Sequence, residues 1–116
     1  MTQQSCIFCK IISKQIPATV IAENDAALAI RDISPKAPIH YLLIPKVHVD
    51  SVATLNQTTA PSASALLLLA QEIAKRDGIS AFNLISNNGA GAGQSVFHLH
   101  FHFLAGKNIY DGGLQL

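Results

Sequence analysis

The stretch Val96–Leu104 reads Val-Phe-His-Leu-His-Phe-His-Phe-Leu and constrains the fold more than any other part of the sequence. Successive side chains of a β-strand point to opposite faces of the sheet, so His98, His100 and His102 would share one face. The residues between them would share the other face and enter a core: Phe97, Leu99, Phe101 and Phe103. The alternation predicts a final strand over Ser95–Leu104, with neighbouring histidines about 6.5 Å apart.

Three imidazoles in a row have a chemical use. Neutral imidazole is a good nucleophile near pH 7, and its phosphorylated form is labile enough for water to hydrolyse it. A neighbouring imidazole can carry protons, because the ordinary histidine pKa is about 6.5. The alternative is a solvated strand face that happens to carry histidine, but the strict alternation just after a glycine-rich loop (residues 87–94) makes this reading less favoured. The row therefore indicates a site for an extended anion, such as a phosphate with its leaving group.

The composition fits one compact domain. Of 116 residues, 49% are apolar and 13% charged, so the chain can bury a core and is not of the disordered class. A net charge of +1 provides no basic footprint for nucleic acid or an anionic membrane. The longest apolar run, Ala65–Ala70, is far shorter than the roughly 20 residues of a spanning helix.

The N-terminal segment lacks a basic head followed by a long apolar run, so we expect no signal peptide and a cytoplasmic protein. In that compartment Cys6 and Cys9 are free thiols or metal ligands rather than a disulfide.

The rest of the pattern predicts an α+β fold with an antiparallel sheet of about five strands. A short apolar segment from Cys9 to Ile16 ends at Pro17. A long helix would have Pro61 in its first turn and Gly78 beyond its last. The expected strands cover residues 20–22, 27–30, 40–44, 82–86 and 95–104.

The long helix has a broad apolar stripe. One of its faces carries Leu66, Leu69, Ala70 and Ile73. Leu67 and Leu68 widen this stripe, so we expect the helix to be covered on two sides. Together with the low surface charge, the stripe predicts a partner subunit.

Several segments resemble the histidine triad (HIT) superfamily, over a stretch from about Cys6 to Gly106. Residues 93–102 resemble its His-x-His-x-His signature, and residues 7–17, 32–40 and 43–48 resemble its other characteristic blocks. The chain length and the segment 104–107 are similar to the Hint branch, the histidine triad nucleotide-binding proteins. The resemblance implies one HIT domain over 1–116 with flanking tails at 1–5 and 107–116, a short N-terminal helix, and a two-fold homodimer.

The resemblance also implies an activity and its residues. The enzyme would act on the α-phosphate of purine nucleoside monophosphate derivatives and hydrolyse phosphoramidate or acyl bonds. His100 would attack the phosphorus and form a nucleotidyl-histidine, which water then hydrolyses, while His102 would hold the phosphate oxygens. Ser95 would contact the phosphate or leaving group, or else bond local main chain. His40 would support the triad.

Nucleotide-binding residues follow from the same resemblance. Asp32 would accept both ribose hydroxyls, because a carboxylate offers two acceptor oxygens and no donor; alternatively it forms a turn before Ser34. The walls of the purine pocket would be Phe8, Ile11, Ile30 and Ile33, although core packing accounts for each equally well. The phosphate end would comprise Asn87 and the main chain of Gly93 and Gln94.

The spacing Cys6-x-x-Cys9 lets two thiolates bind one zinc ion. The chain has no other cysteine, and the resemblance to zinc-binding bacterial members implies His48 and His98 as the remaining ligands. A zinc-bound His98 would be a rigid post beside the nucleophile rather than a proton shuttle. The alternative is two free thiols; a redox pair is disfavoured because no strand precedes the motif.

Two other functions remain open from the sequence: a dinucleoside-polyphosphate hydrolase and a non-catalytic nucleotide-binding module. The complete triad with Ser95 and His40 favours an enzyme, since a binding module has no need of a neutral nucleophilic imidazole. The segment 107–116 contains no tryptophan, unlike the Hint branch, and is a candidate for leaving-group selectivity.

Overall fold

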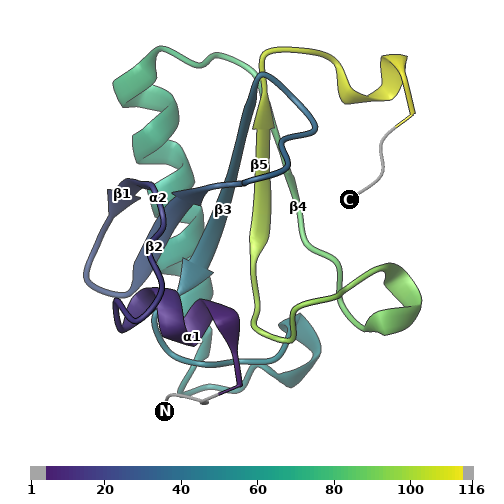
Figure 1. Ribbon diagram of the computed structural model, residues 1–116. Helices are drawn as coiled ribbons and strands as arrows, with labels where there is room; N and C mark the ends of the chain where they lie inside the picture. The colour runs from purple at the N-terminus through teal and green to yellow at the C-terminus, as the bar shows by residue number, and fades with distance from the viewer. Residues whose placement is uncertain (1–4, 114–116) are drawn as a thin grey trace.

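The computed structural model describes residues 5–113 and has an α+β architecture, as predicted (Figure 1). The expected tail residues 1–4 and 114–116 lie outside the described part. The elements in chain order are α1 (Ile7–Ile12), β1 (Val20–Glu23), β2 (Ala27–Arg31), β3 (Ile39–Pro45), α2 (Ala60–Asp77), β4 (Phe82–Ile85) and β5 (Phe101–Ala105). Within residues 5–113 no helix has both the length and the apolar character needed to cross a membrane.

The strands form one five-stranded antiparallel sheet in the order β1-β2-β3-β5-β4, which confirms the predicted sheet. β5 is therefore an inner strand, hydrogen-bonded to β3 on one side and β4 on the other. His102 lies opposite Leu42 of β3 and Ile85 of β4. This topology brings residues from β3 and β5 into contact, although about sixty residues of chain separate them.

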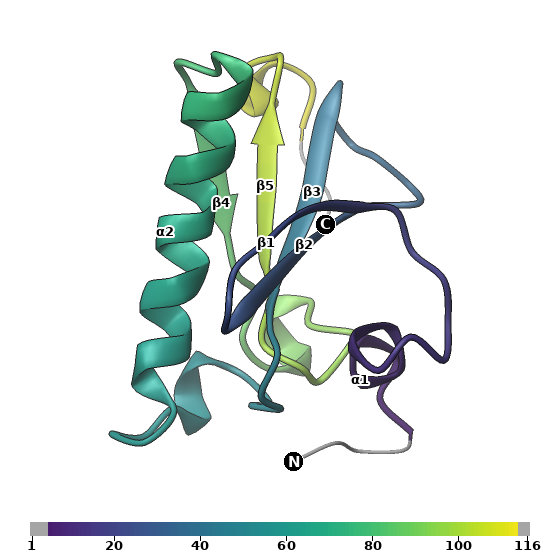
Figure 2. The same cartoon turned by 90° about the vertical axis from the view of Figure 1, so that its left-hand side faces the viewer.

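The two helices lie on opposite faces of the sheet (Figure 2). Residues of β3 and β5 such as Leu43 and Phe103 pack in one core cluster with the buried face of α2. His102 alternates with Phe103 along β5 and therefore points to the opposite face, the one on which α1 lies. Helix α2 thus packs on one face of the sheet, and α1 lies on the other face, which carries His102.

Helix α2 begins with proline in its first turn and ends at Gly78, which adopts a left-handed φ of 66°, as the sequence predicted. The predicted stripe is mostly covered by the chain's own sheet, because the following residues are fully buried: Leu66, Leu69, Ala70 and Ile73. Only Leu67 and Leu68 are exposed, at 51% and 61%. The chain's own sheet therefore provides one of the two expected covers, and a partner subunit over Leu67 and Leu68 stays a prediction.

The final strand is shorter than predicted. It begins at Phe101 rather than Ser95, because both neighbouring strands stop pairing with it there: β3 after Leu43 and β4 after Ile85. The preceding segment is irregular, and the Leu99 N–H donates instead to the Val49 carbonyl at 2.6 Å. Phe97, expected in the core, is 50% exposed. Leu99, Phe101 and Phe103 do pack in the core as predicted, so of the four residues expected there Phe97 is the exception.

The C-terminal segment is partly packed. A short 3₁₀ turn spans Ile109–Asp111, and Ile109 is buried with Ala37 and Leu104. Gly106, with φ of 95°, lets the chain leave β5 close to Pro38: a Cβ there would lie 2.8 Å from the proline Cβ. The segment expected as a flanking tail therefore begins with residues that belong to the domain.

Candidate functional site

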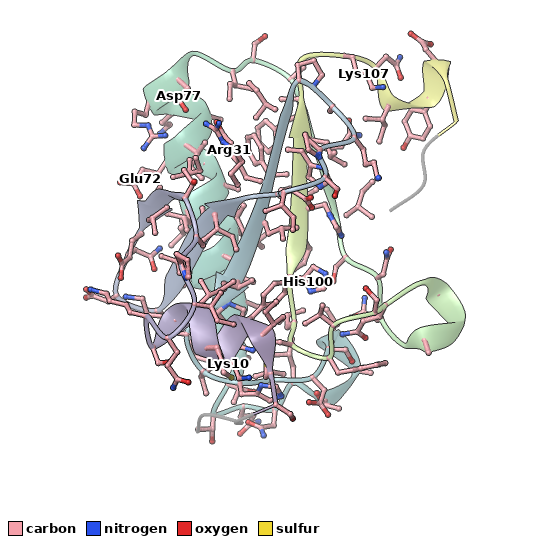
Figure 3. All side chains as sticks on the ribbon, viewed as in Figure 1. Lys10, Arg31, Glu72, Asp77, His100 and Lys107 are labelled. Carbon is pink, nitrogen blue, oxygen red and sulfur yellow. The ribbon has the colours of Figure 1, made fainter. Side chains whose placement is uncertain are left out.

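Four histidines from three parts of the chain gather where β5 begins. His40 comes from β3, His102 from β5, and His98 and His100 from the irregular segment between the glycine-rich loop and β5. Figure 3 shows His100 at the α1 end of β5. All four side chains are buried, with at most 8% of each residue exposed. A solvated row of histidines is therefore excluded.

The ring of His100 has a fixed tautomer. Its Nδ1 lies 2.8 Å from the carbonyl oxygen of His98, which can only accept, so Nδ1 carries the proton and Nε2 has the lone pair. Phe8 of α1 packs edge-on against the ring at a centroid distance of 5.2 Å. Burial lowers the pKa of His100, the largest cause being loss of hydration. His100 is thus a neutral imidazole with an unprotonated Nε2.

A chain of hydrogen bonds fixes the neighbouring tautomers as well. The main-chain N–H of Lys36 donates to His40 Nδ1 at 3.0 Å, so the His40 proton is on Nε2. That Nε2 lies 2.9 Å from His102 Nδ1, which must accept, and this places the His102 proton on its own Nε2. Burial lowers the pKa of His102 to about 4. His102 therefore offers a neutral N–H donor beside His100, whose ring centroid is 5.2 Å away.

Of the two roles that the sequence left open for Asp32, the structure shows the turn, and binding of the ribose hydroxyls stays a prediction. Its Oδ1 accepts the Ser34 N–H at 2.7 Å, which is the expected turn. Its Oδ2 lies 3.4 Å from His40 Nε2, and the carboxylate remains 16% exposed. One oxygen is thus occupied by the loop, and the other faces both the histidine network and solvent.

The apolar candidates divide into two groups. Phe8 and Ile30 are buried in one cluster, and Ile11 packs against it. Phe8 also touches the rings of His98 and His100, so part of its role is to support the triad. Ile33 is 98% exposed beside Asp32 and lies outside that cluster. The structure therefore brings three of the four candidates together and leaves Ile33 on the surface.

The glycine-rich loop is held by the side chain of Gln94, a role that sequence reasoning missed. Its Oε1 accepts the Gly89 N–H at 2.8 Å, and its Nε2 donates to the carbonyls of Asp50 (2.7 Å) and Val96 (3.0 Å). No sequence signal distinguishes this glutamine, because its bond to Asp50 spans 44 residues of chain.

The main-chain N–H groups of Gly93 and Gln94 are also engaged, with the carbonyls of Ala90 and Gly89. They are not free for an anion in this conformation, which differs from the expectation that they bind phosphate. Ser95, by contrast, is exposed at the end of the loop, and Asn87 is half-buried just after β4. Ser95 and Asn87 therefore remain the side-chain candidates for the phosphate end.

The second cluster of the site consists of Cys6, Cys9, His48 and His98, whose potential ligand atoms all lie within 4.8 Å of one another. Cys6 Sγ is 3.4 Å from His98 Nδ1, and Cys9 Sγ is 3.3 Å from His48 Nδ1. The other ring nitrogens donate elsewhere, His98 Nε2 to the Pro45 carbonyl and His48 Nε2 to Asp50 Oδ1, each at 2.8 Å. Both Nδ1 lone pairs consequently face the thiols.

This donor set fits a metal ion. Two sulfurs and two imidazole nitrogens are a common tetrahedral zinc set, and ligand separations near 3.5 Å agree with bonds of about 2.0–2.3 Å. Burial raises the pKa of the Cys6 thiol, and a bound cation would offset that effect by favouring the thiolate. The four residues expected as ligands are thus compatible with a metal site.

A further group, Asp32, His40 and His102, is equally compact, with ligand atoms within 4.8 Å of one another. Its chemistry is different. His40 Nδ1 accepts the Lys36 N–H, so His40 Nε2 carries a proton and has no lone pair for a cation. We therefore interpret this group as a hydrogen-bonded relay and the thiol-containing group as the metal candidate.

Comparison with known proteins gives consistent matches. The HIT domain family matches residues 13–109. Protein HitA of Neisseria gonorrhoeae is 46% identical over 101 residues, covering 86% of this chain and 94% of HitA. Adenylylsulfatase HINT1 of Arabidopsis thaliana is 41% identical over 106 residues, covering 89% of this chain and 72% of that protein. A HIT family hydrolase from Clostridium thermocellum superposes with a TM-score of 0.88 at 40% identity, covering 99% of both chains.

Proposed function

The chain belongs to the HIT domain family, and on this premise we propose that it is a hydrolase of purine nucleoside monophosphate derivatives. Phosphoramidate and acyl bonds to the α-phosphate are the proposed targets. The observation that carries the proposal is the state of His100: a buried, neutral imidazole whose Nδ1 proton is held by the His98 carbonyl, which leaves the Nε2 lone pair free. The Arabidopsis relative is named an adenylylsulfatase, which agrees with chemistry at a nucleotide phosphate.

The proposed reaction has two steps. His100 Nε2 forms a bond to the α-phosphorus while the bond from phosphorus to the leaving amine or carboxylate breaks. A departing amine takes up a proton from solvent, which the water of the second step returns, and a carboxylate leaves as the anion. The His102 Nε2–H donates to a phosphate oxygen, and its position is held by His40 through the 2.9 Å contact. A water molecule then attacks the phosphorus and displaces His100, which restores the free imidazole. Ser95, which is exposed at the end of the loop, is the residue proposed to assist the leaving group.

A comparison of substrates tests the proposal. We expect adenosine phosphoramidate to be turned over faster than diadenosine tetraphosphate, because the phosphoramidate needs only a small amine to depart. Release of nucleoside monophosphate, followed by chromatography, measures both. Faster cleavage of the dinucleotide would instead indicate a dinucleoside-polyphosphate hydrolase. Binding of nucleotide without turnover of either would indicate a binding module.

We further propose that Cys6, Cys9, His48 and His98 hold one zinc ion per chain. The ion would join α1 to the end of β3 and to the triad segment, and it would supply rigidity rather than reaction chemistry. Elemental analysis of protein purified without chelator should find about one zinc per chain, and Cys9→Ser should remove most of it. Metal-free wild-type protein whose two thiols react at once with an alkylating reagent would contradict this site.

We also propose a homodimer formed through α2 and β4. Among the described residues, β4 pairs only with β5, so its other edge is available. A groove of about 320 Å³ lies beside it, lined in part by Leu67 and Phe82, both exposed. Light scattering at micromolar concentration should give the mass of two chains, and Leu67→Asp should give one. Val20→Asp, an exposed position on the opposite edge strand, is the matched control and should leave the dimer intact.

A further inference from the structure

Asp50 lies just outside the thiol-containing cluster, and we propose that it holds His48 in its metal-binding form. The inference rests on the proposed metal site and assigns a role to a residue that is not one of the four ligands. Asp50 follows the loop after β3, and its carboxylate is 56% exposed, whereas the His48 side chain is 6% exposed. The carboxylate therefore reaches from the surface to a buried ring.

The contact between them determines where the His48 proton lies. Asp50 Oδ1 is 2.8 Å from His48 Nε2, and an ionised carboxylate can only accept. A neutral imidazole has a single N–H, so holding it at Nε2 leaves a lone pair on Nδ1. That lone pair is directed at Cys9 Sγ, 3.3 Å away. Without Asp50, the ring could carry its proton on Nδ1, and a protonated Nδ1 has no lone pair with which to bind a cation.

The equivalent proton of His98 is held differently. His98 Nε2 donates to the main-chain carbonyl of Pro45, which no side-chain substitution removes. Of the two histidines in the cluster, only His48 depends on a side chain for its orientation. A substitution at Asp50 can therefore change which nitrogen of His48 carries the proton, without replacing any of the four ligands.

Asp50 is itself anchored independently of any metal. Its main-chain carbonyl accepts the Gln94 side-chain amide at 2.7 Å, and the same amide group is bound into the glycine-rich loop through Gly89. The adjacent Val49 carbonyl accepts the Leu99 N–H at 2.6 Å. The backbone around Asp50 is thus attached both to the loop and to the segment between His98 and His100, so the position of its Cα does not depend on a metal.

The proposal differs from a simple surface ion pair. An exposed pair adds little to stability, typically below about 1 kcal/mol, so its loss would scarcely alter folding. An acceptor that orients a metal-binding histidine instead alters metal affinity, commonly about 10–100-fold, because it fixes the tautomer and the direction of the ring. Metal affinity and folding stability are therefore the two quantities to compare.

The experiment uses the full-length protein and cobalt(II) as the probe, with competition against a chromophoric chelator. Asp50→Ala should weaken cobalt binding about 10–100-fold. Asp50→Asn keeps an acceptor oxygen at the same place and should retain most of the affinity. Asp25→Ala, an exposed carboxylate in the β1–β2 turn, is the control and should bind as wild type does. Thermal melting of the metal-free proteins checks that all four fold alike.

The outcomes separate the role of Asp50 from the site itself. Thiolate-to-cobalt charge-transfer absorption in every variant, with weaker affinity only in Asp50→Ala, supports the proposal. Equal affinity of Asp50→Ala and wild type overturns the role of Asp50 and leaves the metal site standing. Asn as weak as Ala overturns the orientation argument, since charge alone would then matter. Wild-type protein that binds no cobalt overturns both.

Discussion

Replacing His100 with alanine should abolish turnover of adenosine phosphoramidate while nucleoside monophosphate still binds. The substitution removes the Nε2 lone pair that we propose attacks phosphorus, whereas Asp32 and the cluster around Phe8 and Ile30 are untouched. Losing one electrostatic donor typically costs about 10²–10³ in rate, and losing the nucleophile should cost far more. Single-turnover kinetics and calorimetric titration with nucleoside monophosphate measure the two effects separately.

A matched comparison is His102→Ala, which removes a proposed donor but keeps the nucleophile. We expect it to lose about 10²–10³ in rate, with the nucleotidyl-enzyme still detectable by mass spectrometry. His100→Ala should show no such adduct. Near-normal turnover by His100→Ala would disprove the assignment of the nucleophile, and with it the proposed two-step reaction.

Replacing Phe103 with alanine should have the largest effect on stability. Phe103 is fully buried in β5, and its ring stacks on Phe82 of β4 and Tyr41 of β3 at centroid distances of 4.7 and 5.8 Å. Truncating a buried phenylalanine costs about 3–5 kcal/mol in the free energy of unfolding, because transfer energy and packing are both lost. That is a large part of the roughly 5–15 kcal/mol available to a domain.

Urea denaturation of the full-length protein measures this loss. Phe97→Ala is the control, since Phe97 is half-exposed and outside the sheet, and it should cost far less. The comparison is informative because the alternation predicts the same buried environment for both phenylalanines. Equal losses for both variants would contradict the packing described for β5.

The fold was largely predictable from local patterns, and the exceptions have physical causes. Pro61 and Gly78 mark the ends of α2 because proline lacks an N–H and glycine accepts positive φ, both local properties. The beginning of β5 is not a local property. It depends on where β3 and β4 stop offering partners, and that is set by pairing between distant segments. The alternating pattern therefore starts several residues before the strand itself, which begins at Phe101.

The candidate site was predictable in its residue types but not in its hydrogen bonding. The alternating histidines indicate chemistry at a phosphate, and the Cys6-x-x-Cys9 spacing indicates a metal site. In the structure His98 lies with the two cysteines. The role of Gln94 was invisible, because its amide joins the loop to Asp50, which is 44 residues away in the chain. Likewise, the donor to His40 is a main-chain N–H of Lys36, which no residue type reveals.

The use of main-chain groups to place histidine protons bears on how the site can diverge during evolution. The protons of His40, His98 and His100 are placed by main-chain groups of Lys36, Pro45 and His98. Mutational drift replaces side chains much more readily than it changes the path of the backbone, and any residue except proline at position 36 would preserve the first of these bonds. Descendants of this chain can therefore acquire new pocket walls and new leaving-group preferences while inheriting the same acid–base arrangement. The same separation would let a protein engineer alter specificity without rebuilding the nucleophile.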